Sequence, residues 1–155
     1  MNHPPPSAPD RTLDAGRCIS YLTIELKGEI PADLRSLVND WVFGCDICQM
    51  VCPWNRFAPA AGDEAFVSRE RLPQPDLMTE LEIDATTFGQ KFSRSPVRRS
   101  RHGGYLRNVA VALGNVAGPE AIPALQTAAD SGEPLVAEHA AWAIQRIRAR
   151  PRVNA

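Results

Sequence analysis

Residues 107–116 read RNVAVALGNV, and residues 138–147 read EHAAWAIQRI. Written one above the other, at an offset of 31 residues, they place alanine or aliphatic side chains at matching positions. Around both stretches apolar residues recur at the spacing of one helix face. These positions are Leu106, Val109, Ala110, Leu113 and Ala117, then Leu135, His139, Ala140, Ala143, Ile144 and Ile147. Alanine-rich helix pairs repeated at this period are typical of a HEAT-type α-solenoid, in which small residues let helices approach closely. We therefore expect a mainly α fold that ends in a short HEAT-like α-solenoid piece, supported by the rest of the chain or by a partner.

The composition limits the class of protein. The chain has 155 residues, 44% of them hydrophobic and 23% charged, which suits one ordinary domain or two very small ones. No apolar run approaches the roughly 18 residues of a membrane span. The sequence also shows no secretion signal and no N-glycosylation site, so we expect a cytoplasmic protein whose four cysteines are thiols. The net charge of −1 gives no global reason to expect nucleic-acid binding, which must rest on local charge.

Shorter elements are predicted between these regions. The apolar run at residues 18–26 is a strand or a short buried helix, because periodicity alone does not separate the two. Residues 31–44 predict a helix that Gly44 closes in a left-handed conformation. Further short helices are expected over 84–92 and around 122–125.

Three of the four cysteines lie in FGCDICQMVCPWN, residues 43–55. They form the pattern C-x2-C-x3-C-P, the second half of the bacterial ferredoxin run C-x2-C-x2-C-x3-C-P. In two-cluster ferredoxins the cysteine before proline ligates the other cluster. An upstream cysteine is the natural replacement for the ligand missing from the near cluster. The pattern predicts iron-sulfur ligands at Cys18, Cys45, Cys48 and Cys52.

Other readings of the cysteines stay open. A redox-active dithiol fits a C-x2-C but not a third cysteine followed by proline. Structural zinc accepts four thiolates, although its sites usually contain two C-x2-C knuckles. Inert buried thiols would not need to be clustered. A single cluster held by all four thiolates requires Cys52 to turn inward, and Pro53 opposes this by favouring an extended backbone before it.

Several long segments together resemble a known enzyme family. RCISYLTIELKG, VFGCDICQMVCPWN, SPVRRSRHGGYLRNVAVALGN and EHAAWAI are similar, in this order, to the C-terminal part of epoxyqueuosine reductase, the cobalamin-dependent enzyme of the last step of queuosine synthesis in tRNA. The resemblance runs from about Leu13 to Ile147. It implies an N-terminal cobalamin domain, a ferredoxin-like module with two [4Fe-4S] clusters, and a HEAT-like piece that helps to hold the anticodon stem-loop region of tRNA. Electrons would pass through the clusters to cobalamin, which reduces the epoxide at the wobble position.

The resemblance also assigns the cysteines. Cys18, Cys45 and Cys48 match three ligands of one cluster, and Cys52 matches the ligand given to the other. The run C-x2-C-x2-C-x3-C-P, the cobalamin domain and the catalytic acid of the family are not in this sequence. We therefore expect a fragment or a subunit that has no catalytic residue of its own, with a companion polypeptide or missing domain supplying the other ligands.

A basic segment precedes the first long helix. Residues 91–107 read KFSRSPVRRSRHGGYLR and contain no acidic residue. Such a run is often only a solvated face, but arginines bind phosphate through paired hydrogen bonds, and helix N-termini favour anions. The expected phosphate contacts are Lys91, Arg94, Arg98, Arg99, Arg101, His102 and Arg107.

The remaining aromatic and histidine residues have structural interpretations. His139 is expected to be a satisfied core histidine, and Trp41 and Trp142 to be core residues. Trp54 is expected to shield the cluster sulfurs from water rather than to relay electrons.

These patterns divide the chain into four parts. Residues 1–12 are a disordered lead-in, 13–58 a partial ferredoxin-like iron-sulfur module, 59–92 an irregular connection with a short helix, and 93–150 the basic segment and HEAT-like repeat. Two other functions stay open: a free-standing ferredoxin-like electron carrier that docks to a protein, and a zinc-stabilised RNA-binding module.

Overall fold

The computed structural model describes residues 14–57 and 75–150. Throughout these two ranges the regular elements are helices, and no strand occurs. The mainly α class is therefore confirmed. The lead-in over 1–12 and the part of the connection over 59–74 lie outside the described residues. Among the helices described, none combines the length and the apolar character that crossing a membrane requires.

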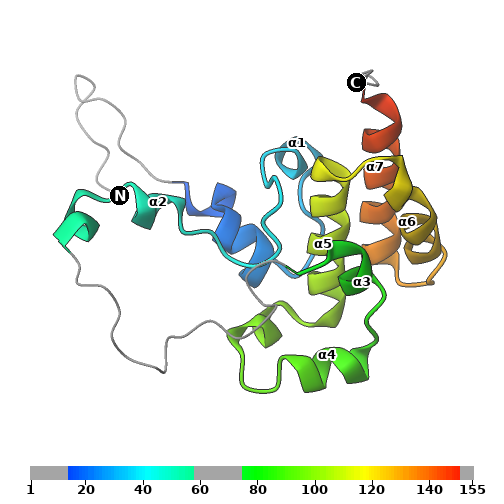
Figure 1. Cartoon of the computed structure of the whole chain (residues 1–155), viewed down its shortest axis with the longest axis horizontal. Coiled ribbons are helices and arrows are strands. Elements are labelled where there is room, and N and C mark those ends of the chain that lie inside the picture. Colours follow the sequence, from blue (N-terminus) through cyan, green and yellow to red (C-terminus); the bar gives the residue numbers. More distant parts are fainter. Residues whose placement is uncertain (1–13, 58–74, 151–155) are drawn as a thin grey trace.

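The long helix α5 (His102–Val116) lies at the centre of the fold (Figure 1). It is buried from Gly104 to Gly114 and packs along α7 (Pro134–Ala149). The short turn η6 (Pro119–Ala121) and α6 (Ile122–Ala129) connect the two long helices and cover α7. The helix pair expected from the alanine-rich repeat is thus confirmed, with the short helix expected between them.

Small residues bring α5 and α7 close together, as the repeat predicts. A Cβ atom added at Gly114 would lie 2.8 Å from Cβ of Ala143 and 2.7 Å from Cζ3 of Trp142. Real Cβ atoms do not approach neighbours this closely, so position 114 accepts only glycine without a shift of α7.

Two short helices and a turn close the other side of α5. They are α3 (Leu77–Leu81), α4 (Ala85–Lys91) and η5 (Pro96–Ser100). Asp84 caps α4 by accepting a 2.6 Å hydrogen bond from the backbone N–H of Thr87, and this bond keeps the pKa of Asp84 below its ordinary value. Phe88 and Phe92 pack their rings against Tyr105 of α5, at centroid separations of 5.5 and 5.2 Å. The helix predicted over 84–92 is confirmed.

The cysteine-bearing segment folds as short helical turns. It contains η1 (Ala15–Arg17), the π-helical turn η2 (Tyr21–Glu25), α1 (Ala32–Arg35), α2 (Ile47–Met50) and η3 (Pro53–Phe57). The run over 18–26, which periodicity left open, is therefore helical. Figure 1 shows α2 well away from the packed helices α5, α6 and α7.

The long helix predicted over 31–44 is wrong. Only the four residues of α1 are α-helical, because the chain turns at Asn39, whose φ of 55° is left-handed. The side-chain amide of Asn115 on α5 donates to the carbonyl oxygens of Arg35 and Asn39, at 2.8 and 3.0 Å, and holds this turn. Gly44 does adopt the left-handed conformation, with φ of 74°, although it follows a turn rather than a long helix.

Two hydrophobic clusters meet at α5. The larger one joins α3 to α7, and the smaller one contains Leu22, Ile30, Leu34 and Val38 together with Val111 of α5. Trp142 packs against both clusters. The residues of the cysteine-bearing segment therefore complete their core with a side chain from the helical repeat.

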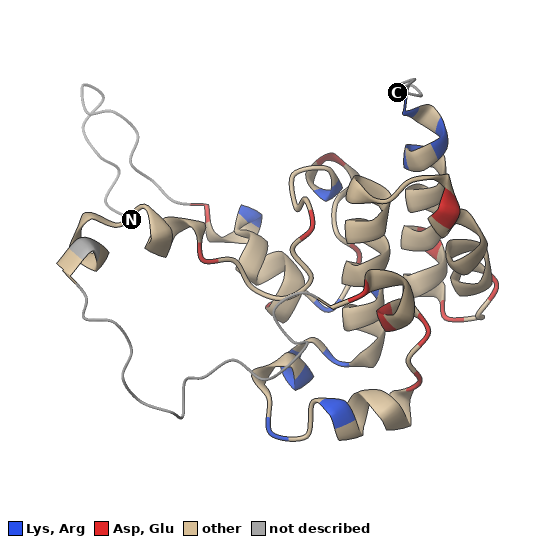
Figure 2. Cartoon of the chain, viewed as in Figure 1, with Lys and Arg blue, Asp and Glu red and all other residues tan. Residues whose placement is uncertain are grey.

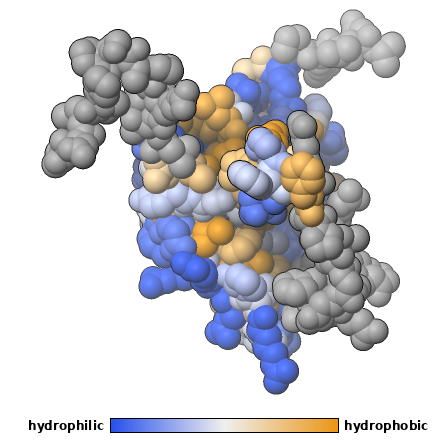
Figure 3. Space-filling view, turned by 90° about the vertical axis from the view of Figure 1, so that its left-hand side faces the viewer, coloured by the Kyte–Doolittle hydropathy of each residue, from blue (hydrophilic) through white to orange (hydrophobic). Residues whose placement is uncertain are grey.

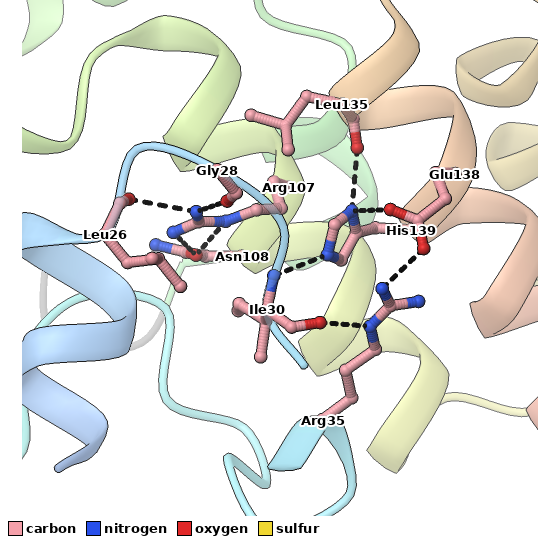
Figure 4. A network of polar contacts seen from close by, with 9 residues as sticks. All are labelled: Leu26, Gly28, Ile30, Arg35, Arg107, Asn108, Leu135, Glu138 and His139. Carbon is pink, nitrogen blue, oxygen red and sulfur yellow. Dashed lines mark hydrogen bonds and ion pairs between the residues drawn. The ribbon is translucent and has the colours of Figure 1, made fainter. Parts of the chain in front are cut away.

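A buried polar network joins the two regions (Figure 4). His139 is fully buried; its Nδ1–H donates to the carbonyl of Leu135 at 2.7 Å, and its Nε2 accepts from the backbone N–H of Ile30 at 3.1 Å. Burial lowers the pKa of His139 to about 4, so the ring is neutral at pH 7 and both nitrogens are used. Arg35 donates to Glu138 at 2.5 Å and to the carbonyl of Ile30 at 2.7 Å. The satisfied core histidine predicted at 139 is confirmed.

Candidate functional site

Hydrogen bonds bring the segments of Cys18 and Cys45 side by side. Ser20 Oγ donates to the carbonyl of Cys45 at 3.3 Å. Thr23 Oγ1 donates to the carbonyl of Ile19 at 2.8 Å and accepts from the backbone N–H of Gly44 at 3.0 Å. The buried threonine thus fixes the chain just after the first cysteine to the turn just before the second.

Helix α5 supports both segments through one asparagine. The buried amide of Asn108 donates to the carbonyl oxygens of Thr23 and Val42, at 2.7 and 2.9 Å. Asn108 therefore holds the two cysteine segments in register from the side of the helical repeat. Sequence analysis missed this role, because a single asparagine inside an apolar helix does not reveal its partners.

Cys48 and Cys52 lie in the part that extends away from the core. Cys48 is exposed within α2, and Cys52 lies two residues after the end of α2. Asn55 Nδ2 donates to the carbonyl of Gln49 at 2.6 Å and folds η3 back on α2. Cys52 then lines an open pocket of about 320 Å³ with Asp46, Gln49, Met50 and Asn55. A ligand arriving from outside the chain can therefore reach this thiol.

The donor chemistry of the cysteines fits an iron-sulfur cluster. All four are free thiols, and each is exposed or half-buried rather than sealed in a core. Within 14–57 and 75–150, however, no three His, Cys, Asp or Glu side chains converge on one metal position. The structure brings the chain around Cys18 and Cys45 together but does not gather the four sulfurs into one site, so the ligand assignment stays a prediction.

Apolar side chains beside the cysteines are exposed. The exposed fractions are 76% for Met50, 82% for Trp54 and 82% for Phe57. Figure 3 views this end of the molecule and shows orange, hydrophobic surface between hydrophilic side chains. Trp54 is not packed into the core of the described residues, and its role as a shield of the cluster sulfurs stays a prediction.

The basic segment lies at the lower end of the view in Figure 2, where the ribbon carries blue Lys and Arg positions. Arg94, Arg98 and Arg101 are exposed, and none of them forms an ion pair with a described residue. Arg101 directly precedes α5 with φ of 62° and ψ of 165°, a backbone conformation that L side chains rarely adopt.

Other members of the predicted phosphate-binding set already have partners. Lys91 forms an ion pair with the buried Glu80, which also accepts a 2.7 Å hydrogen bond from the hydroxyl of Tyr105. Arg99 pairs with Glu25 of η2, and its carbonyl accepts from Lys27. His102 is half-buried and donates from Nε2 to the carbonyl of Ile83 at 2.8 Å. Lys91 and Arg99 stay partly exposed, whereas the ring of His102 is used within the fold.

Arg107 does not lie on the basic surface. It is fully buried, and its guanidinium donates to the carbonyl oxygens of Leu22, Leu26 and Gly28 and to Oδ1 of Asn108. Figure 4 shows the bonds to Leu26, Gly28 and Asn108. Burial lowers its pKa to about 10, so it is still charged at pH 7. The prediction of a phosphate contact at Arg107 is corrected: through the carbonyl groups of Leu22, Leu26 and Gly28 it holds η2 and the chain after it against α5.

The chain is similar to known proteins both in its cysteine-bearing segment and over most of its length. Residues 6–55 match the model of the 4Fe-4S double cluster binding domain. The chain is 44% identical over 140 residues to epoxyqueuosine reductase of Escherichia coli (strain K12), a match that covers 90% of this chain and 37% of that protein. It is 48% identical over 137 residues to epoxyqueuosine reductase of Pseudomonas aeruginosa, covering 86% of this chain and 37% of the relative. The chain is related to the epoxyqueuosine reductases. It spans little more than a third of the length of these two relatives.

Solved structures of epoxyqueuosine reductases share the fold. One is a crystal structure of epoxyqueuosine reductase with a tRNA-Tyr epoxyqueuosine-modified stem loop, which is 31% identical, with a TM-score of 0.80 over 87% of this chain and 36% of that one. Another, from Streptococcus thermophilus, is 30% identical, with a TM-score of 0.79 over 90% of this chain and 37% of that one. The likeness covers both the cysteine-bearing segment and the helical repeat, so the two regions occur together in the epoxyqueuosine reductases.

Proposed function

We propose that this chain is the iron-sulfur and RNA-binding part of an epoxyqueuosine reductase. The observation that carries the proposal is the C-x2-C-x3-C-P pattern of free thiols, which lies inside the match to the double cluster domain. The catalytic group, the cobalamin site and the remaining cluster ligands would lie on polypeptide that corresponds to the unmatched part of the relatives. The complete protein would reduce epoxyqueuosine to queuosine at the wobble position of tRNA, in the cytoplasm.

The four cysteines have distinct roles in this proposal. Cys18, Cys45 and Cys48 would hold one [4Fe-4S] cluster, and Cys52 would contribute to a second. Such clusters supply single-electron transfer when bound. Thr23, Ser20 and Asn108 would hold the backbone beside Cys18 and Cys45, and the open pocket beside Cys52 would admit ligands from the companion. No residue of this chain is assigned to cobalamin.

Anaerobic reconstitution tests the iron-sulfur part. The full chain is mixed with iron, sulfide and the companion polypeptide, and bound iron, acid-labile sulfide and visible absorption are measured. We expect broad brown absorption that dithionite bleaches, and loss of at least one cluster in Cys48→Ser. Ile47→Ala, an exposed neighbour in the same helix that does not line the pocket beside Cys52, serves as the matched control and should keep full sulfide content. A complex that holds no inorganic sulfide overturns the proposal, and a colourless protein with bound zinc supports the zinc alternative.

RNA binding would use the exposed part of the basic segment. Arg94, Arg98 and Arg101 lie together before α5 and present guanidinium groups to solvent. Phosphate contacts of this kind fix the position of RNA and carry little base information. Three such contacts give a slope of about −2 to −3 for log K against log salt. A relative solved with a tRNA stem loop supports RNA as the partner.

Salt-dependent binding to an RNA stem-loop tests this surface. Arg94→Ala combined with Arg98→Ala should weaken binding and reduce the slope by about 2, because each phosphate contact contributes about 1. The control is Arg146→Ala with Arg148→Ala, since these exposed arginines lie at the far end of α7 (Figure 2). Equal effects of the two double variants would remove the basic segment from the site.

Arg101→Gly separates function from stability. Glycine adopts the backbone conformation of this position without strain, so the variant should gain about 1 kcal/mol of stability. It should nevertheless bind RNA more weakly, because it loses one guanidinium. A variant that is more stable and binds equally well shows that Arg101 does not contact phosphate.

A free-standing electron carrier is the second candidate. The exposed side chains of Met50, Trp54 and Phe57 favour it, because apolar surface beside a redox site suits docking to a protein. A chain that holds a redox-active cluster and does not bind RNA at low salt would support this function over the first.

A further inference from the structure

A groove of about 670 Å³ lies beside α5, whose residues Tyr105 and Val116 line it. The segment over residues 40–43 lines it together with Pro75 and Leu77. Lys91, Phe92 and Val97 of the basic segment complete the lining. The volume lies within the range of pockets that hold small ligands, and a nucleotide fits within it.

The lining of the groove is mainly apolar and includes four aromatic rings. Trp41 and Phe43 are half-buried at its edge, whereas Phe92 and Tyr105 are almost fully buried at its base. Phe43 is not packed into either hydrophobic cluster, so its ring contributes to the groove rather than to the core. Flat half-exposed rings at the mouth of a groove provide surfaces on which another planar ring stacks.

Two charged residues line the same groove with different roles. Lys91 pairs with Glu80, which also binds the hydroxyl of Tyr105, so this triad neutralises itself. Asp40 is exposed and has no ion pair within the described ranges. Its carboxylate is therefore available to accept hydrogen bonds from a ligand, and the amino and imino groups of nucleobases donate such bonds.

The groove shares residues with the basic segment. Lys91, Phe92 and Val97 line it, and the exposed Arg94 and Arg98 are their close neighbours in the chain. An RNA backbone held by these arginines passes beside the mouth of the groove. An aromatic groove next to phosphate-binding arginines matches the way in which proteins recognise RNA loops, where unstacked bases stack on aromatic rings.

We propose that this groove takes one unstacked nucleobase of the bound RNA, which stacks on Phe43 and Trp41 and donates hydrogen bonds to Asp40. The inference rests on the RNA-binding part of the proposed function and adds to it the residues that read an unpaired base. It assigns recognition of loop RNA to the groove and attachment of the backbone to the arginines. Double-stranded RNA, whose bases are stacked and paired, does not use the groove.

Binding of two RNAs to the full chain tests the proposal. The first is a hairpin with a fluorescent adenine analogue in its unpaired loop, and the second is a fully paired duplex of equal length. Phe43→Ala should weaken hairpin binding by about fivefold to a hundredfold, the usual effect of removing one stacking ring, and should leave duplex binding unchanged. The quenching of the analogue by the protein should also be lost.

The matched control is Phe57→Ala, which removes a more exposed ring outside the groove. It should alter neither hairpin binding nor quenching. Asp40→Asn should change the preference among loop bases, because an amide both donates and accepts. Equal hairpin affinity of Phe43→Ala, Phe57→Ala and the unchanged chain overturns the nucleobase proposal while the basic surface survives. Absence of any salt-dependent RNA binding instead overturns the proposed function itself.

Discussion

The helical body over residues 77–149 and the cysteine-bearing segment over 14–57 bury their apolar side chains to different degrees. In the helical body Leu125 and Val136 are fully buried or nearly so, whereas in the other segment Met50, Trp54 and Phe57 are at least three-quarters exposed. The cysteine-bearing segment is also built from short turns that take core and polar partners from α5. The comparison indicates that most of the stability of the fold comes from the helical body. The cysteine-bearing segment depends on the helical body for its own stability.

Removing the main link between the regions should have the largest effect. In Arg107→Leu three backbone carbonyl oxygens and the Asn108 side chain lose their donors inside the fold. We expect a loss of about 3–5 kcal/mol in the free energy of unfolding, measured with urea. Arg98→Ala, an exposed arginine, should change it by less than about 0.5 kcal/mol. If Arg107→Leu does not fold, Arg107→Lys keeps the charge without the planar guanidinium and should show a smaller loss. Equal stability of Arg98→Ala and Arg107→Lys would show that the hydrogen bonds of Arg107 do not stabilise the contact between the two regions.

Acid should weaken the packing of the cysteine-bearing segment against the helical body, where His139 accepts a hydrogen bond from Ile30. The pKa of His139 is about 4 in the fold against 6.5 ordinarily, so between these values the unfolded chain binds a proton that the folded chain does not. The free energy of unfolding should therefore fall as the pH drops from 6.5 towards 4, by up to about 3 kcal/mol, and stay constant with respect to this group above 6.5.

Urea titrations at several pH values measure this loss. His139→Gln should be less stable at pH 7 but should lack this part of the pH dependence, because glutamine does not titrate. The same slope in both proteins between pH 6.5 and 4 would show that another group is responsible.

Two glycines of the helical body differ in how closely other residues pack against them. Gly114→Ala places a Cβ against Trp142 and Ala143 and should cost about 1–3 kcal/mol by overpacking. Gly89→Ala in α4 meets nothing within 4 Å and should gain about 0.5–1 kcal/mol through higher helix propensity. Thermal unfolding of the two variants measures both signs. If both substitutions change the stability in the same direction, the side chain at position 114 does not limit how closely α5 and α7 approach.

The exposed apolar residues should have the smallest effect. Trp54→Ser should change the free energy of unfolding of the chain by less than about 0.5 kcal/mol, because the ring is 82% exposed. Leu125→Ala, fully buried in the helical body, should lose about 2–5 kcal/mol. Urea unfolding compares the two. A large loss in Trp54→Ser would show that the ring of Trp54 is packed against other residues.

Several elements were predictable because their signals are local. The apolar spacing of α5 and α7, the short helix over 84–92 and the left-handed glycine at 44 each follow from a few neighbouring residues. The helix over 31–44 was overpredicted, because Asn115, far away in the sequence, stabilises a turn that local propensity does not indicate. The basic segment shows the same limit: charge density reveals the run, but only packing separates the exposed Arg98 from the buried Arg107.

By itself the sequence determined the helical class, the HEAT-like helix pair and the cysteine pattern with its likeness to the epoxyqueuosine reductases. These depend on residue type and on spacing along the chain. Only the tertiary structure decided that Asn108 and Arg107 support the cysteine segments, that Trp54 is exposed, and that an aromatic groove lies beside the free arginines. The physical reason is that burial and hydrogen-bond partners depend on residues far apart in the chain, such as Thr23 and Asn108, which come together only when α5 packs against the first segment.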